Sequence, residues 1–98
     1  MGLNISIKHE AEVEIEESLV FYAKISDQLV LGLIDEIESA KADISKNPLQ
    51  FQAISKKYRK ASLKVYPYKI IYHIVDNEIL IVAFAHHKRK PYYWRSRK

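Results

Sequence analysis

The sequence predicts an α+β fold of the order β-α-α-β-β-β, in which a helical hairpin packs on one face of a small, mainly antiparallel sheet. Two observations lead to this prediction. Apolar residues recur at helical spacing through most of the first half of the chain, and they alternate or run together, as in strands, through the second half. With 98 residues and 48% apolar content, the chain fits a single domain with one core, spanning residues 1–98.

A short strand and a helix begin the chain. Residues 3–8 alternate apolar and polar side chains, which is typical of a half-buried strand. Residues 9–25 contain no glycine or proline and carry a helical stripe of apolar side chains: Ala11, Ile15, Leu19 and Tyr22. Glu10, Glu14 and Glu17 lie on the opposite side of this helix, where we expect water to solvate them.

A second helix follows after a short loop. Asp27 is its expected N-cap, because an aspartate side chain accepts hydrogen bonds from the free N–H groups of a first helical turn. Asn47-Pro48 ends the helix, because proline disfavours a helical conformation in the residue before it. Its apolar stripe consists of Leu29, Leu33, Ile37, Ala40 and Ile44. Two helices joined by so short a loop are expected to form an antiparallel hairpin.

The second half of the chain changes to a strand pattern. Residues 61–66, 68–75 and 78–85 are the predicted strands, and residues 49–60 are expected to be mainly loop. Asp76-Asn77 is a two-residue turn, since both residues tolerate a positive φ. The last strand is almost continuously apolar, which predicts an interior position in the sheet.

Strict alternation assigns each side chain of these strands to a face. In residues 68–75 it places Ile70, Tyr72 and Ile74 on one face of the sheet and Lys69, Ile71, His73 and Val75 on the other. In the last strand it places Leu80, Val82, Phe84 and His86 on one face and Ile79, Ile81, Ala83, Ala85 and His87 on the opposite face. The two adjacent histidines are therefore not expected to face the same groove.

Charge is divided unevenly along the chain. The net charge is +4, but residues 1–47 hold four cations and ten carboxylates, whereas residues 48–98 hold twelve cations and two carboxylates. Acidic helices lying against a basic sheet would balance only part of this excess. A one-sided basic surface suggests a polyanionic or acidic partner.

Several classes of site and location are disfavoured by the sequence. It has no cysteine, no glycine-rich phosphate loop and no histidines with carboxylates at ligand spacing, so we expect neither a metal nor a cofactor. No apolar run approaches the roughly 20 residues of a membrane-spanning helix, and the N-terminus does not resemble a signal peptide. We therefore expect a cytoplasmic protein with no membrane partner.

The end of the last strand holds the strongest candidates for chemistry. A histidine near its ordinary pKa suits proton transfer at neutral pH, and an arginine stabilises charge that develops on a phosphate. His86, Arg89, Tyr92 and Tyr93 lie together in the sequence. Each has an alternative structural role, as a hydrogen-bonded residue at a strand end or an ordinary aromatic contact. For Trp94 we favour packing over base stacking, because tryptophan is usually largely buried.

Lysines supply the rest of a possible nucleic-acid surface. Cations before, within and after the predicted sheet could neutralise phosphates of a bound RNA. The lysines assigned to this surface are Lys56, Lys57, Lys60, Lys64, Lys88 and Lys90.

In combination, four segments resemble the RelE/ParE toxin superfamily of type II toxin–antitoxin modules. They are Asn47-Pro48, Tyr58-Arg59-Lys60, Tyr66-Pro67-Tyr68-x-Ile70-x-Tyr72 and Ile81-Val82-Ala83-x-Ala85-His86-x-x-Arg89-x-Pro91-x-x-Trp94. The likeness also extends over the helical hairpin, so it covers nearly the whole chain. It implies a small toxin that a cognate antitoxin neutralises, with an acidic antitoxin segment over the basic groove.

The resemblance implies two alternative activities. RelE-like members cleave mRNA on the ribosome without a metal, whereas ParE-like members inhibit DNA gyrase and are not nucleases. By similarity, Arg59 and Arg89 would contact the phosphate in a RelE-like site, with His86, Tyr92 or Tyr93 contributing to catalysis and Lys56 and Lys57 nearby. The sequence slightly favours the ribosome-dependent mRNA endonuclease. A non-toxic RNA-binding protein with a degenerate toxin fold is a third interpretation.

Overall fold

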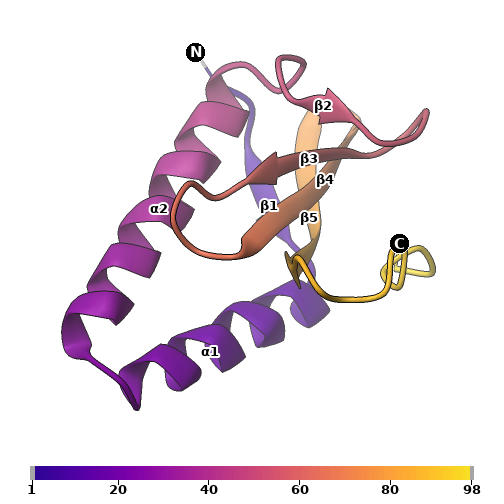
Figure 1. Cartoon of the computed structure of the whole chain (residues 1–98). Coiled ribbons are helices and arrows are strands. Elements are labelled where there is room, and N and C mark those ends of the chain that lie inside the picture. The colour runs from indigo at the N-terminus through magenta and orange to yellow at the C-terminus, as the bar shows by residue number, and fades with distance from the viewer. Residues whose placement is uncertain (1, 98) are drawn as a thin grey trace.

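The computed structural model describes residues 2–97 and confirms the predicted α+β fold (Figure 1). The two helices cover one face of a five-stranded sheet, and the C-terminal segment lies on the side of the sheet away from α2. The elements are β1 (Ile5–Ile7), α1 (His9–Ala23), α2 (Asp27–Lys46), β2 (Gln52–Ala53), β3 (Arg59–Ser62), β4 (Tyr68–Val75) and β5 (Glu78–His86).

The strands are ordered β1-β5-β4-β3-β2. β1 runs parallel to β5, and the other neighbours are antiparallel. The interior position predicted for β5 is confirmed, because it pairs with β1 on one side and β4 on the other. The predicted turn is also confirmed, since Asp76 and Asn77 have φ values of 52° and 62°.

The first residue and the buried face of α2 agree closely with the prediction, apart from its N-cap. The N-cap of α2 is Ser26 rather than Asp27, because the Ser26 hydroxyl accepts hydrogen bonds from the N–H groups of Gln28 and Leu29. The predicted stripe of α2 faces the core, with Leu33, Ile37 and Ile44 fully buried. Figure 1 shows the helices diverging from their connecting turn, so the hairpin is open rather than closely antiparallel.

The strand predicted at residues 61–66 lies earlier in the chain than expected. β3 covers Arg59–Ser62 and a short β2 precedes it, whereas residues 64–66 turn away from the sheet. The N–H groups of Lys64 and Val65 bond to the carboxylate of Glu36 in α2 instead of to a strand. The Tyr66 hydroxyl donates to Leu29 O at 2.6 Å, which fixes this turn against α2.

A β-bulge at Val82 overturns the alternation predicted for β5. Ile71 is paired with Ala83 but Tyr72 with Ile81, so Val82 has no partner in β4. An extra residue reverses which face the following side chains point to. Consequently Ile79, Ile81 and Phe84 all pack in the helix-facing core, while Val82 and Ala83 lie on the other face.

That other face has a small core of its own. Trp94 is only 3% exposed and packs with Tyr58, Ile71, Val82 and Ala83. The C-terminal segment therefore closes over the sheet, as predicted for Trp94, instead of extending into solvent. Within residues 2–97 we find no helix long and apolar enough to cross a membrane.

Candidate functional site

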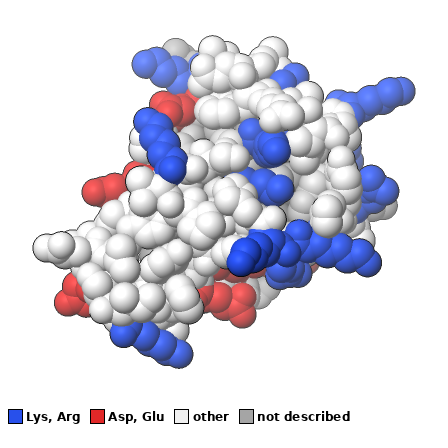
Figure 2. Space-filling model, viewed as in Figure 1, with Lys and Arg blue, Asp and Glu red and all other residues white. Residues whose placement is uncertain are grey.

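A basic groove runs between the C-terminal segment and the sheet. We call it the tail groove. It encloses about 140 Å³, and no carboxylate is among the described residues that line it: Ile54, Lys60, Lys69, Ile71, Ala85, His86, Arg89, Lys90, Pro91, Tyr92, Tyr93 and Trp94. Figure 2 shows Lys and Arg side chains over this side of the molecule, while several acidic side chains lie toward the helices.

Strand pairing places two lysines on the floor of the tail groove. Lys60 pairs with Ile71, and Lys69 pairs with Ala85, so both lysines share the face that Ile71 and Ala85 present to the C-terminal segment. Neither lysine forms an ion pair among the described residues. Lys69 was not among the candidate site residues, although its alternation with Ile71 placed it on the correct face.

The two histidines at the end of β5 have different surroundings. His86 lines the tail groove, packs edge-on against Tyr68 and accepts a hydrogen bond at Nδ1 from the Lys88 N–H. A neutral His86 therefore carries its proton on Nε2. Burial lowers the pKa of His87, and the charges of Lys69, His86 and Lys60 lower it further.

Arg89 and Tyr93 are held by a carboxylate that the sequence analysis assigned to a solvated helix face. The guanidinium of Arg89 lies 3.8 Å from the centre of the Tyr93 ring and 3.9 Å from Glu14 Oε2. The Tyr93 hydroxyl donates to the same Glu14 oxygen at 2.6 Å. Arg97 binds Glu14 with two nitrogens, at 2.8 Å and 3.2 Å.

Glu14 also accepts a hydrogen bond from the backbone N–H of Phe84, so one carboxylate joins α1, β5 and the C-terminal segment. Its side chain is only 11% exposed, and the prediction of a solvated Glu14 was wrong. Burial favours the neutral acid, but the hydrogen bonds from Arg97, Tyr93 and Phe84 outweigh it and hold the pKa of Glu14 below 4.5. Helical periodicity could not identify these partners, because they come from residues distant in sequence.

Tyr92 adopts a left-handed backbone conformation, with φ of 62°, at the wall of the tail groove. Its hydroxyl donates to Ile54 O, and the Arg95 guanidinium lies 4.8 Å from the centre of its ring. Tyr92 as a whole is 41% exposed. Of the two candidate tyrosines, Tyr92 thus offers more surface to a ligand, whereas Tyr93 is the anchor of the segment.

Arg59 is separated from this group. It is paired with Tyr72 on the helix-facing side of the sheet, and its Nη1 donates to the carbonyls of Phe51 and Leu49 at 2.7 Å and 3.3 Å. Together with Lys56 and Lys57 it lines a different cleft, at the start of β3. Lys64 lies at the groove between α2 and β3, and Lys88 is exposed beyond the end of β5. The structure therefore brings together His86, Arg89, Lys60, Lys90, Tyr92 and Tyr93, without the other candidates.

This arrangement suits binding of an anion more than chemistry on it. The tail groove has cations, an exposed tyrosine and a histidine, but its arginine lies on the Tyr93 ring and the hydroxyls of Tyr92 and Tyr93 are hydrogen-bonded to the protein. In the described part of the chain there is no group of three His, Cys, Asp or Glu side chains that could hold a metal.

Comparison with known sequences identifies the family. A sequence model described as the ParE toxin of the type II toxin–antitoxin system, parDE, matches residues 5–91. The chain belongs to the ParE toxin family. The match includes both helices and every strand, together with His86 and Arg89, but it ends before Tyr92. The sequence has no significant match among curated proteins.

Solved structures share the fold of this ParE-family chain. The chromosomal ParDE system from P. aeruginosa aligns with a TM-score of 0.74 and 14% identity, over 86% of this chain and 95% of that chain. The RelBE2 toxin–antitoxin complex from Mycobacterium tuberculosis aligns with a TM-score of 0.61 and 16% identity, over 88% of this chain and 99% of that chain. A variant of the E. coli toxin RelE in the free state aligns with a TM-score of 0.64 and 11% identity, over 90% of this chain and 86% of that chain. At such identities the likeness shows the fold alone.

Proposed function

We propose that this ParE-family toxin acts by binding DNA gyrase and inhibiting it, rather than by cleaving mRNA. The observation that carries the proposal is the engagement of the candidate catalytic groups in holding the fold. This reverses the slight preference for an mRNA endonuclease that the sequence suggested.

Metal-independent RNA cleavage needs a phosphate-binding cation and proton-transfer groups directed at one phosphate. Here Arg59 binds loop carbonyls on the helix-facing side of the sheet, away from the tail groove. Arg89 lies on the Tyr93 ring, and the Tyr93 hydroxyl bonds to Glu14. Burial raises the pKa of Tyr93, and the bond to Glu14 raises it further, so this hydroxyl is a poor proton donor at neutral pH.

Family membership supports the same target. The chain belongs to the ParE toxins, and by its resemblance to that family a ParE-like member inhibits gyrase without cleaving nucleic acid. Its partner is then a cognate antitoxin. The apolar surface left on the helical hairpin, which includes Val20, Phe21, Ile25 and Leu31 at 56–61% exposure, would suit the apolar part of that antitoxin.

Ribosome-dependent mRNA cleavage is the second candidate. It is favoured by the tail groove, where Lys60, Lys69 and His86 lie together without a neutralising carboxylate. Binding of RNA could move Arg89 away from Tyr93 and direct it into the groove, since catalytic contacts often form only in the complex.

Expression of the toxin without an antitoxin separates the two candidates. Gyrase inhibition predicts arrested growth with a DNA-damage response and intact mRNA. It also predicts that the double variant Arg89→Ala with His86→Gln leaves the arrest largely unchanged, provided that circular dichroism shows this variant folded. Cleaved mRNA in arrested cells, with relief by that pair of substitutions, would favour the nuclease. Harmless overexpression of folded protein would contradict both.

A further inference from the structure

One turn of the C-terminal segment holds a strained residue. Three residues other than glycine have a positive φ within residues 2–97: Asp76, Asn77 and Tyr92. The first two form the turn between β4 and β5, and their short polar side chains tolerate this conformation. Tyr92, with φ of 62°, carries a bulky aromatic ring, and asparagine or glycine would adopt the same backbone at lower cost. We call residues 90–95 the Tyr92 turn.

The neighbours of Tyr92 hold the backbone in this conformation. Pro91 before it has a restricted φ, and the Arg95 N–H donates to Tyr92 O at 3.0 Å, which closes the turn. Tyr93 is bonded to α1, and Trp94 is buried at 3% exposure, so the chain after Tyr92 is anchored to the fold. The strain is therefore imposed by the surroundings and does not depend on the Tyr92 ring.

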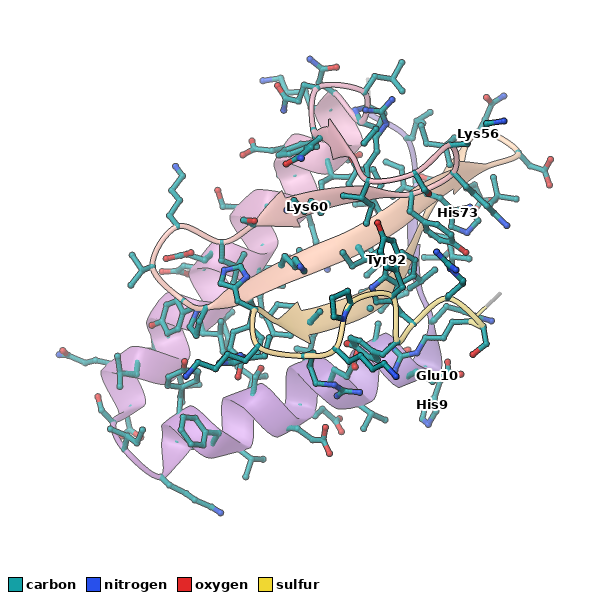
Figure 3. All side chains as sticks on the ribbon, turned by 45° about the vertical axis from the view of Figure 1, so that its right-hand side comes forward. His9, Glu10, Lys56, Lys60, His73 and Tyr92 are labelled. Carbon is teal, nitrogen blue, oxygen red and sulfur yellow. The ribbon has the colours of Figure 1, made fainter. Side chains whose placement is uncertain are left out.

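The Tyr92 side chain lies at the surface rather than in the core. Tyr92 is 41% exposed, and the one hydrogen bond of its hydroxyl among the described residues is 3.3 Å long, to Ile54 O. Its ring is tilted against that of Trp94, with the ring centres 5.6 Å apart. Figure 3 shows Tyr92 over the face of the sheet that α2 leaves uncovered. A strained backbone at an exposed, weakly bonded aromatic residue indicates a residue retained for contact with another molecule.

Exposed cations accompany this ring. The guanidinium of Arg95 lies 4.8 Å from the centre of the Tyr92 ring, and Lys90 is exposed at the start of the same turn. Neither cation forms an ion pair in the described part of the chain. Tyrosine and arginine are enriched among the residues that carry most of the binding energy of protein interfaces. A nucleic-acid base would have to displace Arg95 to stack on that face of the ring, so the turn suits a protein surface better.

We propose that the Tyr92 turn is the surface through which this toxin binds gyrase, at a gyrase patch where carboxylates surround an apolar surface. Tyr92 and Arg95 supply the central contact, and Lys90 adds charge complementarity. Because the backbone of the turn is already fixed, little conformational freedom is lost on binding. The choice of gyrase as the partner rests on the proposed function. The contact goes beyond family membership, since the family match ends at residue 91, before Tyr92 and Arg95.

Binding of the toxin to purified gyrase, measured by surface plasmon resonance, tests this contact. Tyr92→Asn supplies a side chain that tolerates the left-handed backbone, and it should weaken binding at least about tenfold. The toxin concentration needed to inhibit supercoiling should rise by a similar factor. The urea midpoint should stay unchanged or increase, because the strain is relieved while Trp94 remains buried. Tyr92→Gly is a second variant with the same expected loss of binding.

A pair of substitutions with equal charge change separates a specific contact from general attraction. Arg95→Gln should weaken binding about fivefold, because it removes both the charge and the guanidinium beside the Tyr92 ring. Lys24→Gln removes the same charge from the C-cap of α1, at the end of the molecule away from the C-terminal segment (Figure 1). This control should leave the affinity unchanged.

The contact and the proposed function fail in different ways. Unchanged affinity of a folded Tyr92→Asn, with the wild-type toxin still bound, would overturn the contact and leave gyrase inhibition standing. A lower urea midpoint in both Tyr92 variants would also overturn it, since the ring would then belong to the fold. Equal losses in Arg95→Gln and Lys24→Gln would indicate nonspecific attraction and contradict the contact. Weaker binding of Tyr92→Asn to a single-stranded oligonucleotide alone would indicate base stacking and contradict it as well. Absence of wild-type binding to gyrase would contradict the proposed function and this contact together.

Discussion

The Tyr93 hydroxyl donates a 2.6 Å hydrogen bond to Glu14 Oε2, which joins residues 79 positions apart in the chain. Because the same carboxylate binds Arg97 and the Phe84 N–H, the C-terminal segment is attached to α1 and β5 at one point. The wall of the tail groove is therefore set by a glutamate on a helix outside it. Tyr93, which the sequence suggested as a catalytic residue, therefore helps to maintain the fold.

Glu14→Gln should destabilise the protein by about 2 kcal/mol, because the amide cannot accept from all four donors and leaves the partly buried Arg97 without its counter-charge. Urea unfolding followed by Trp94 fluorescence measures the loss, and Trp94 is the only tryptophan in the sequence. Glu17→Gln, an exposed glutamate on the same helix, is the matched control and should change stability little. Equal effects of the two substitutions would contradict the role assigned to Glu14.

Acid should release the C-terminal segment. The pKa of Glu14 is lowered in the folded protein, because the hydrogen bonds that favour its charge outweigh burial, so its stabilising contribution is present above about pH 4.5 and is lost as the pH falls through the lower, folded value. The fluorescence emission of Trp94 should therefore shift to the red as the pH falls below about 4.5. In Glu14→Gln this pH-dependent component should be absent, and an identical acid transition in both proteins would assign it to other carboxylates.

His73 should make the protein less stable at mildly acidic pH. Burial and the charge of Lys57 lower its pKa in the folded state, so below about pH 6.5 the unfolded chain binds a proton that the folded chain does not. The free energy of unfolding should therefore fall from pH 6.5 downward and stay flat above it. His73→Leu should remove most of this slope and raise stability at pH 7.

A matched substitution checks the assignment of that slope. His87→Gln removes the other histidine with a lowered pKa, but His87 is exposed and should account for only a small part of the effect. If His87→Gln flattened the profile and His73→Leu did not, the buried, neutral state assigned to His73 would be incorrect. Both profiles can be measured by urea unfolding in one buffer series across this pH range.

Gly32 and Tyr66 should be energetically coupled. A methyl group at Gly32 would meet the Tyr66 hydroxyl, which is held by its bond to Leu29 O. Gly32→Ala should therefore destabilise the protein by about 1 kcal/mol, although alanine favours helices. With Tyr66→Phe in the background, the same substitution should become stabilising. Thermal unfolding of the four proteins gives the coupling, and additive effects would show that the clash is relieved by other movements.

Periodicity predicted the elements that depend on local sequence. The stripe of α2 and the Asp76-Asn77 turn could be identified because each uses a spacing or a φ preference that neighbouring residues specify. The N-cap was misplaced by one position, since Ser26 and Asp27 are both good capping residues and only the geometry distinguishes them.

What the sequence could not show depends on register and on distant partners. The bulge at Val82 has no local signal, yet it determines which face Phe84 occupies. Glu14 appeared to be one of several glutamates on a solvated face, because its partners Tyr93 and Arg97 lie at the other end of the chain. The tail groove could be anticipated from its cations, but its anchoring carboxylate could not.

A supercoiling assay with purified gyrase tests the proposed function most directly. Added toxin should inhibit supercoiling of relaxed plasmid in a dose-dependent manner, and Arg89→Ala with His86→Gln should inhibit to a similar extent if the variant remains folded. Prior mixing with the cognate antitoxin should restore activity. Normal supercoiling at saturating toxin, together with cleavage of mRNA on purified ribosomes by the same preparation, would contradict the account.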